Sequence, residues 1–208
     1  MIPLDSLSVF FTASLLLALA PGPDNMFVLT QAAIRGWRAG LAITFGLCTG
    51  LLVHTAAVAF GVAAIFQAST VAFTGLKLIG AAYLLYLAWQ AFHAPAESLE
   101  LTTGPAMPLF PLYRRGIVMN ITNPKVSIFF LAFLPQFADP SRGLLAFQMI
   151  VLGIVFMIAA VLVFTSISVM AGTIGSRLRS RPAVQIYMNK IAGVIFAALA
   201  VKLAFAKR

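Results

Sequence analysis

Long apolar segments recur along the 208 residues of this chain, separated by short polar or basic turns. Each is about 20 residues long, the length that a helix needs to cross a hydrocarbon core roughly 30 Å thick. No strand-like alternation of polar and apolar positions is present, so the pattern predicts membrane-spanning helices and not a β-barrel. The expected spans are residues 7–34, 41–66, 71–92, 116–134, 144–171 and 191–205.

Two of these segments are interrupted near their middle by proline. The letters PGP interrupt the first segment and NPK the fourth. Proline lacks the N–H that a helix interior needs and clashes with the preceding turn, so each segment is predicted to be a broken helix. If Pro23 is aligned with Pro124, Asp24 falls on Lys125. The two breaks therefore carry opposite charges at equivalent positions.

A proline-rich polar stretch, residues 93–113, divides the chain into residues 1–92 and residues 114–208, with three predicted spans in each. An odd number of spans in each half makes two similar halves insert with opposite orientation. Inverted repeats with interrupted helices near the midplane are typical of secondary transporters. We therefore expect an all-α integral membrane protein with six transmembrane helices, arranged as two inverted three-helix repeats whose first helices (spans 1 and 4) are interrupted.

The composition supports a membrane protein, since 62% of the residues are hydrophobic, 9% are charged and the mean hydropathy is +1.02. A soluble domain is nearer 45–50% apolar and about 25% charged. The net charge of +9 would suggest nucleic acid in a soluble protein, but here the basic residues lie mostly between apolar segments, so we expect no nucleic-acid partner. The turns after spans 1, 3 and 5 hold most of them: Arg35, Arg38, Arg114, Arg115, Arg177, Arg179, Arg181 and Lys190. Basic residues favour the cytoplasmic side, which predicts a cytoplasmic linker and both termini outside the cytoplasm.

The depth of Asp24 and Lys125 makes them the leading candidates for function. Counted along a helix from Arg35 and Arg115, they lie about 16 Å and about 15 Å from the cytoplasmic edge, near mid-bilayer. A charge at that depth costs about 2.5–3.5 kcal/mol on insertion scales. Two explanations are open: the pair faces a cavity and binds a zwitterion, ammonium on Asp24 and carboxylate on Lys125, or the two charges neutralise each other as a structural pair.

The remaining polar candidates have weaker signals. The amides of Asn25, Asn120 and Asn123 either cap freed backbone groups or bind substrate. His54 is either a proton relay or a neutral hydrogen-bonded core residue. Lys77 lies near the start of its span and can extend to the interface. The full set of candidate site residues is Asp24, Lys125, Asn123, Asn25, Pro21, Gly22, Pro23 and Pro124, followed by Asn120, His54 and Lys77.

Several chemistries are not supported by the sequence. It has no HExxH, P-loop or GxSxG motif and no acidic cluster, so we expect neither an enzyme nor a cofactor. Of the five carboxylates only Asp24 lies deep in a span, so a divalent-metal site is not expected either.

Three motifs resemble those of one known family, the LysE/RhtB family of bacterial amino-acid exporters. They are APGPDN at residues 20–25, LKLIGAAYL at residues 76–84, and NPK at residues 123–125 running into FLPQF at residues 133–137. The resemblance covers nearly the whole chain. It implies efflux of amino acids or close derivatives from the cytoplasm, driven by proton exchange, and it strengthens the case for Lys77.

The chain departs from the family pattern in one place. Many relatives carry an acidic residue toward the end of span 5, where residues 163–168 read VFTSIS. This difference leaves Asp24 as the candidate for proton coupling.

From the residues and the resemblance we predict a secondary transporter in the bacterial inner membrane that exports neutral or basic amino acids by proton antiport and alternating access. The alternatives are an exporter of another small solute or ion, and a membrane scaffold without transport. The GxxxG spacing of Gly46 and Gly50 fits packing within one subunit or between the copies of a homo-oligomer.

Overall fold

The computed structural model describes residues 2–62, 70–95, 108–179 and 182–205. Within these ranges every regular element is helical. In chain order they are α1 (Leu4–Leu19), α2 (Pro23–Arg35), α3 (Trp37–Ala57), η1 (Val58–Val62), α5 (Thr70–His93), α6 (Leu109–Ile121), α7 (Pro124–Ile128), η2 (Phe129–Phe133), η3 (Leu134–Phe137), η4 (Pro140–Arg142), α8 (Leu145–Arg179) and α9 (Pro182–Phe205).

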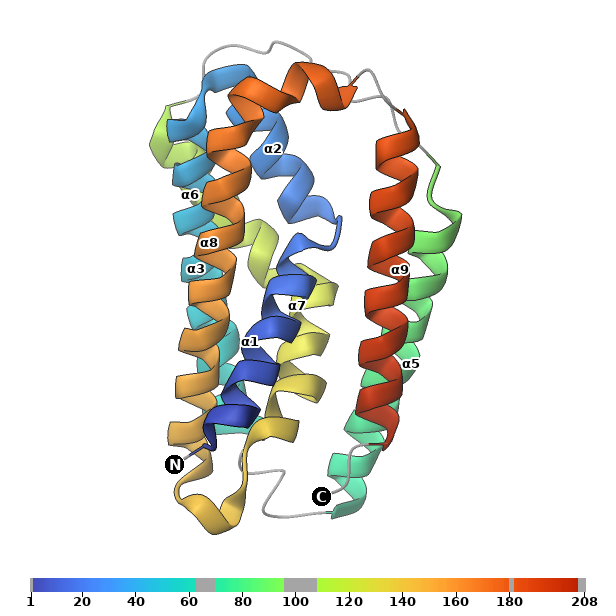
Figure 1. The fold of residues 1–208 in the computed structure, drawn as a ribbon. Helices are drawn as coiled ribbons and strands as arrows, with labels where there is room; N and C mark the ends of the chain where they lie inside the picture. The colour runs from blue at the N-terminus through green and yellow to red at the C-terminus, as the bar shows by residue number, and fades with distance from the viewer. Residues whose placement is uncertain (1, 63–69, 96–107, 180–181, 206–208) are drawn as a thin grey trace.

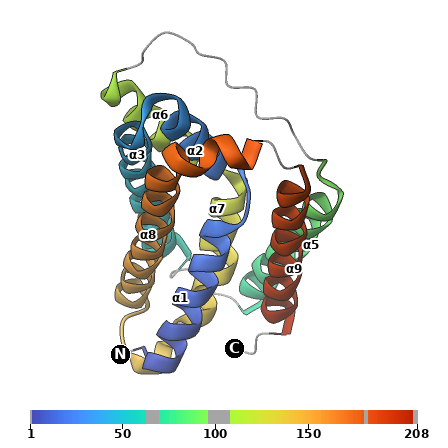
Figure 2. The same cartoon turned by 45° about the horizontal axis from the view of Figure 1, so that its top comes forward.

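The helices form two groups (Figures 1 and 2). In one group α3 packs against α6 and α8, and α8 also packs against α1 and α2. In the other, α5 and α9 lie side by side, and they meet the first group through η2 and α1. Helices from both halves of the sequence are thus interleaved. The first residues of α1 and the last residues of α9 lie at the same end of the molecule, as six spans require.

The predicted membrane spans are present. Four helices are long and apolar enough to cross a bilayer, and two bent pairs raise the number to six if each pair is one span. The pairs are α1 with α2, bent by 60°, and α6 with the helical segment that follows it, bent by 50°. These are the first and fourth predicted spans, so the prediction that both are broken is confirmed.

Some boundaries differ from those expected. The helix α6 begins at Leu109, inside the predicted linker, so Arg114 and Arg115 lie within a helix. Similarly, α8 continues to Arg179 and α9 begins at Pro182, which shortens the basic turn predicted there. The last residues of the second predicted span (63–66), the central part of the predicted linker (96–107) and Arg181 lie outside the described residues.

Each break follows from its local sequence. The residue before a proline is disfavoured in helical conformation, and accordingly α1 ends at Leu19, one residue before Ala20-Pro21. Gly22 is extended, and Pro23 begins α2 at the first helical position, where its missing N–H costs nothing. At the second break Asn123 caps α7 by accepting a hydrogen bond from the backbone N–H of Lys125, at 3.0 Å.

Glycine permits a close crossing of the backbones of α3 and α6. A methyl group added to Gly116 would lie 2.6 Å from the carbonyl oxygen of Ile43, and one added to Gly46 would overlap the carbonyl of Tyr113. One turn further along α3, a methyl on Gly50 would lie 2.7 Å from the side chain of Asn120. The predicted GxxxG pair therefore packs inside the subunit and brings α3 against the end of α6.

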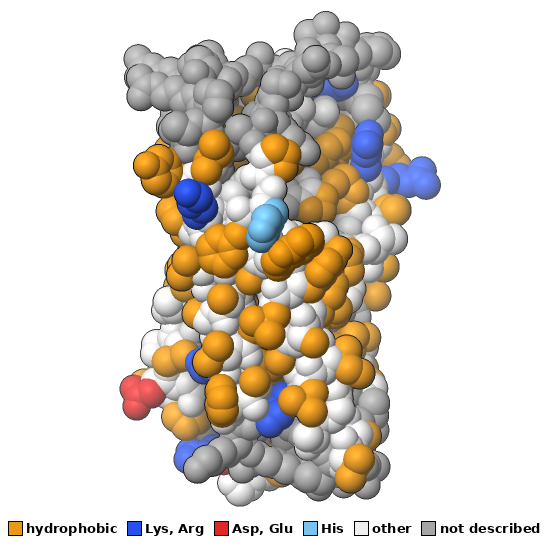
Figure 3. Space-filling view, turned by 90° about the vertical axis from the view of Figure 1, so that its right-hand side faces the viewer, with side chains coloured by type: hydrophobic (Ala, Val, Ile, Leu, Met, Phe, Trp, Pro, Cys, Tyr) orange, Lys and Arg blue, Asp and Glu red, His pale blue; other side chains and the backbone are white. Residues whose placement is uncertain are grey.

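The surface formed by α5 and α9 is apolar over its central part (Figure 3). Large side chains of these two helices are exposed, among them Ile79 (66%), Trp89 (58%), Ile191 (59%) and Val194 (60%). In the same view blue Lys and Arg groups lie toward both ends of the molecule, and a red acidic group lies toward the lower end. An apolar band between charged ends is what a lipid-facing surface requires.

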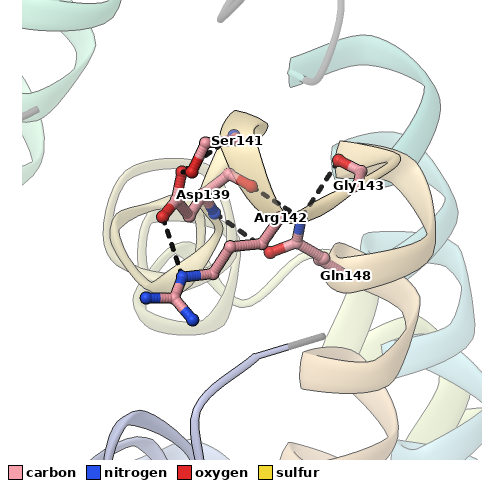
Figure 4. A network of polar contacts seen from close by, with 5 residues as sticks. All are labelled: Asp139, Ser141, Arg142, Gly143 and Gln148. Carbon is pink, nitrogen blue, oxygen red and sulfur yellow. Dashed lines mark hydrogen bonds and ion pairs between the residues drawn. The ribbon is translucent and has the colours of Figure 1, made fainter.

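At the end of the molecule where α1 begins, a polar turn joins η3 to α8 (Figure 4). The Asp139 carboxylate accepts hydrogen bonds from the N–H and hydroxyl of Ser141, at 2.9 Å and 2.7 Å, and from Arg142 Nε at 3.0 Å. Gln148 closes the turn by bonding the backbone N–H and C=O of Asp139. The bonds from Ser141, with a smaller contribution from Arg142, hold the pKa of the Asp139 carboxyl below its ordinary value.

Candidate substrate site at the helix breaks

Asp24 and Lys125 occupy the second position of the half-helices that follow the two breaks. Both are buried, with 4% and 8% of their surface exposed. A carboxylate is favoured in the first turn of a helix, where the backbone N–H groups point, and this suits Asp24. Lys125 has the opposite sign for its position in α7, so its charge must be stabilised from elsewhere.

The end of α1 supplies that stabilisation. The ammonium of Lys125 donates hydrogen bonds to the carbonyl oxygens of Ala20 at 3.0 Å and of Leu17 at 3.3 Å. These carbonyls are free of helical partners because the proline break ends α1 there. The negative end of the helix dipole points at the same place. A third carbonyl, that of Ala18, accepts a 2.6 Å bond from Asn25 Nδ2.

Asp24 contacts the end of the other broken helix. Its Oδ2 accepts a hydrogen bond from Asn120 Nδ2 at 3.4 Å, whereas Oδ1 is buried without a partner. Although Lys125 lies close enough to act on Asp24 electrostatically, no ion pair within 4.0 Å joins these two described residues. The structural-pair explanation in its simplest form, a direct salt bridge, is therefore not what this structure contains.

His54 and the amides hold the second break together. His54 lies on α3 and its Nε2 bonds the carbonyl oxygen of Asn120 at 3.1 Å, near the end of α6. Because a carbonyl only accepts, Nε2 must carry a proton in this contact. Asn123 Nδ2 and Asn120 Oδ1 are buried without hydrogen-bond partners. The break is therefore capped on its carbonyl side, with spare polar atoms left beside Asp24.

A cavity of about 310 Å³ lies against the two breaks. Lys125, Asn123 and Pro124 line it from the second break, and residues 21–23 line it from the first. The opposite wall comes from α5 and α9: Tyr83, Leu87, Gln90, Ala91, Ala94, Asn189, Ala192 and Phe196. Among the described residues that line it, Lys125 is the charged one.

Asp24 and Asn25 face a separate, smaller space. With Asn120 and Lys125 they line a cavity of about 20 Å³, enough for one water-sized group. Of the described residues, Lys125 is the one that lines both cavities. Of the two explanations left open by the sequence, the zwitterion site had Asp24 and Lys125 face one cavity; here Lys125 lines both cavities and Asp24 lines the smaller one. Lys77, on α5, lines neither of them.

The α5–α9 wall is the part of the site that sequence analysis missed. The α5 residues Tyr83, Leu87, Gln90 and Ala94 recur at helical spacing and so share a face, as do Asn189 and Phe196 on α9. The spacing was available as a signal, but no charge distinguishes this face from the lipid-facing one.

Phenylalanine rings lie between Lys125 and the end of the molecule where α1 begins. The ring of Phe129 lies 4.8 Å from that of Phe133 and 6.0 Å from that of Phe10, and Phe137 lies 5.0 Å from Phe10. Beyond them a hollow of about 450 Å³ is lined by polar residues that include Asp139 and Lys202. The rings belong to α1 and to the irregular helix η2–η3, where Pro135 lacks the N–H that a regular turn would need.

No group of three or more His, Cys, Asp or Glu that could hold a metal ion occurs in the part of the chain that the structure describes.

The sequence decides the family. Residues 15–207 match the model of the LysE type translocator family. This chain belongs to that family. As a LysE-type translocator it is a membrane efflux transporter and not an enzyme, which confirms both the resemblance and the prediction that it has no catalytic activity.

Named relatives cover most of the chain. A homoserine/homoserine lactone efflux protein of Salmonella typhimurium is 33% identical over 199 residues, 95% of each protein. An uncharacterized membrane protein of Vibrio cholerae is 33% identical over 198 residues, covering 95% of this translocator and 96% of the relative. A leucine efflux protein of Salmonella typhimurium is 29% identical over 131 residues, 62% of each. No solved structure matches the translocator significantly.

Proposed function

We propose that this translocator is a secondary transporter that exports neutral amino acids or their close derivatives by alternating access. The observation that carries the proposal is the cavity at the helix breaks, which presents the Lys125 ammonium, amides and an apolar wall. At about 310 Å³ it lies at the small end of the range typical of ligand pockets, which suits a single amino acid.

The lining favours neutral over basic substrates. Lys125 and the amide of Asn123 suit a carboxylate, and Leu87 and Phe196 suit an apolar or weakly polar side chain. A lysine or arginine substrate would bring a second cation, and none of the described residues that line this cavity is a carboxylate that could receive it. The relatives named for efflux of homoserine, homoserine lactone and leucine agree with this choice.

The position of the cavity supports exchange between two open states. Its lining extends from Lys125, predicted to lie near mid-bilayer, to Ala94, which directly follows α5, and to Asn189, the eighth residue of α9. In the opposite direction the phenylalanine cluster blocks the way. With the orientation predicted from the basic turns, this end of the cavity points toward the cytoplasm, the side from which an exporter takes up its substrate. Both termini would then lie outside the cytoplasm, and the protein would span the inner membrane of a bacterium.

Asp24 is our candidate for coupling export to protons. Burial favours its neutral form, and a nearby ammonium favours its charged form. Its partners, Asn120 and the more distant Lys125, belong to the other half of the chain, so a change in the relative position of the halves would change its environment. Such a carboxylate can take up a proton in one state and release it in the other.

Proteoliposomes with a trapped pH indicator test the proposal directly. We expect an applied gradient of leucine or homoserine to drive a proton flux in the opposite direction, and lysine to drive little. Flux driven by lysine alone would contradict the choice of neutral substrates. Amino-acid movement without any proton flux would contradict antiport, and the absence of both would contradict amino-acid export.

A further inference from the structure

The Lys125 ammonium lies at the end of α1, in a site whose surroundings suit an ammonium group. It donates to the carbonyl oxygens of Ala20 and Leu17, at 3.0 Å and 3.3 Å, and the missing side chain of Gly22 leaves room for it. A methyl group on Gly22 would lie 3.1 Å from Nζ. The site combines free backbone carbonyls with the negative end of the α1 dipole, and both favour a cation.

Two further hydrogen-bond acceptors beside this site have no donor. Oδ1 of Asp24 and Oδ1 of Asn25 are buried without a hydrogen-bond partner, and their side chains are 4% and 7% exposed. Both residues line the cavity of about 20 Å³ that Lys125 also lines. Unpaired buried acceptors are costly, and only a donor or a cation can satisfy them. Together with the carbonyls they form an acceptor set that one lysine ammonium does not exhaust.

We propose that the end of α1, with Asp24 and Asn25, is the subsite for the ammonium group of the substrate, and that Lys125 occupies it as a tethered substitute until substrate arrives. The inference deepens the proposed function, on which it rests only for the identity of the natural ligand. An amino acid provides both groups needed for the exchange. Its carboxylate draws Lys125 into the larger cavity, and its ammonium takes the place that Nζ leaves.

This exchange conserves charge at each position. One ammonium replaces another on the α1 carbonyls, and the displaced Lys125 meets a carboxylate and not a dry cavity. A simple amine would have to displace Lys125 from the α1 carbonyls without providing a carboxylate to pair with it. A simple carboxylate would draw Lys125 away and leave the carbonyls and Asp24 without a cation. The tethered substitute therefore selects molecules that carry both groups.

Fragments of one amino acid test the inference on purified protein in detergent. The probes are 3-methylbutylamine and 4-methylpentanoate, which are leucine without its carboxylate and without its amine. Affinity is measured from ligand-dependent thermal stabilisation. The variants are Lys125→Met and Lys125→Gln, and Lys190→Met is the control because it removes an exposed lysine of α9.

In the Lys125 variants we expect the amine to bind about tenfold tighter than in wild type, and the carboxylate about tenfold weaker, the size of one charged hydrogen bond. Lys190→Met should resemble wild type for both. If the amine binds equally or more weakly in the Lys125 variants, Lys125 does not occupy the ammonium subsite and the inference is wrong.

Wild-type protein gives a second test that does not depend on how the variants fold. Saturating 4-methylpentanoate should raise the affinity for the amine about tenfold, because its carboxylate draws Lys125 away and leaves the site at the end of α1 free. The amine must raise the affinity for 4-methylpentanoate by the same factor. Independent binding of the two fragments would overturn the inference. Neither measurement requires transport, so a protein that shows this coupling but moves no amino acid would contradict the proposed function and not the subsite.

Discussion

Asp24 and Lys125 each contact the end of the half-helix that precedes the other. Lys125, in the second half of the chain, donates to the carbonyls of Leu17 and Ala20 at the end of α1. Asp24, in the first half, accepts from Asn120 near the end of α6. The two contacts cross between the breaks in opposite directions. This reciprocity is what two inverted repeats would produce, and the division into repeats at residues 1–92 and 114–208 stays a prediction.

The reciprocal contact makes Asp24→Asn the most informative substitution. An amide keeps the shape of the side chain and an oxygen that can accept from Asn120, so we expect a change in unfolding free energy of less than about 2 kcal/mol. Proton-coupled flux should be lost, because the side chain no longer titrates. Thermal unfolding and the proteoliposome pH measurement report the two effects separately.

Asp139→Asn is the matched control for Asp24→Asn. It makes the same chemical change in an exposed turn at the far end of the molecule, and coupled flux should remain near the wild-type level. If Asp24→Asn transports like wild type, Asp24 is not the coupling group.

His54 distinguishes capping from proton relay. Its Nε2–H donates to the Asn120 carbonyl, a role that a glutamine side-chain N–H can also fill. We therefore expect His54→Gln to retain most of the transport. His54→Leu should lose about 1–3 kcal/mol of stability, because it leaves a buried carbonyl unpaired. An inactive but stably folded His54→Gln protein would favour the relay that the sequence left open.

The crossing of α3 and α6 should tolerate no side chain at Gly116. A methyl group there would meet the Ile43 carbonyl at 2.6 Å, so the backbones must separate. We expect Gly116→Ala to cost about 1–3 kcal/mol, the usual effect of overpacking. Gly75→Ala is the control, since nothing lies within 4 Å of its added methyl group, and it should be neutral or slightly stabilising in a helix. Equal unfolding temperatures for the two variants would contradict the close crossing.

A structural feature could be predicted from the sequence where it depends on local residues. Proline breaks, apolar length and buried charge are local, and they predicted the broken first and fourth spans and the residues that meet at the breaks. The partner of Lys125 was not predictable, because the carbonyls of Leu17 and Ala20 are backbone groups that carry no residue-type signal. The same holds for Tyr83 and Asn189, whose role depends on which faces of α5 and α9 turn inward.

Acid should weaken the turn at Asp139. Bonds from Ser141 hold the pKa of the folded carboxyl below the ordinary value of 3.8. The resulting stabilisation is fully present above the ordinary value and is lost as the pH falls through the folded one. The unfolding temperatures of wild type and Asp139→Asn should therefore differ most above about pH 5 and converge in strong acid. A difference that stays constant across this range would show that Asp139 acts without titrating.

The phenylalanine cluster should seal the side of the site that faces the start of α1. Phe129 is fully buried and its ring contacts those of Phe10, Phe133 and Phe156. Phe129→Ala would remove this plug and leave a void, at a cost of about 3–5 kcal/mol in stability. If the cluster is the barrier, the same variant should also raise the substrate-independent proton leak of proteoliposomes.

Two further variants separate the barrier from general loosening of the fold. Phe129→Leu keeps most of the volume and should leak much less than Phe129→Ala. Phe45→Ala removes a ring that is 58% exposed on α3, outside the cluster, and should leave the leak unchanged. A tight Phe129→Ala protein would mean that a different part of the structure closes this side.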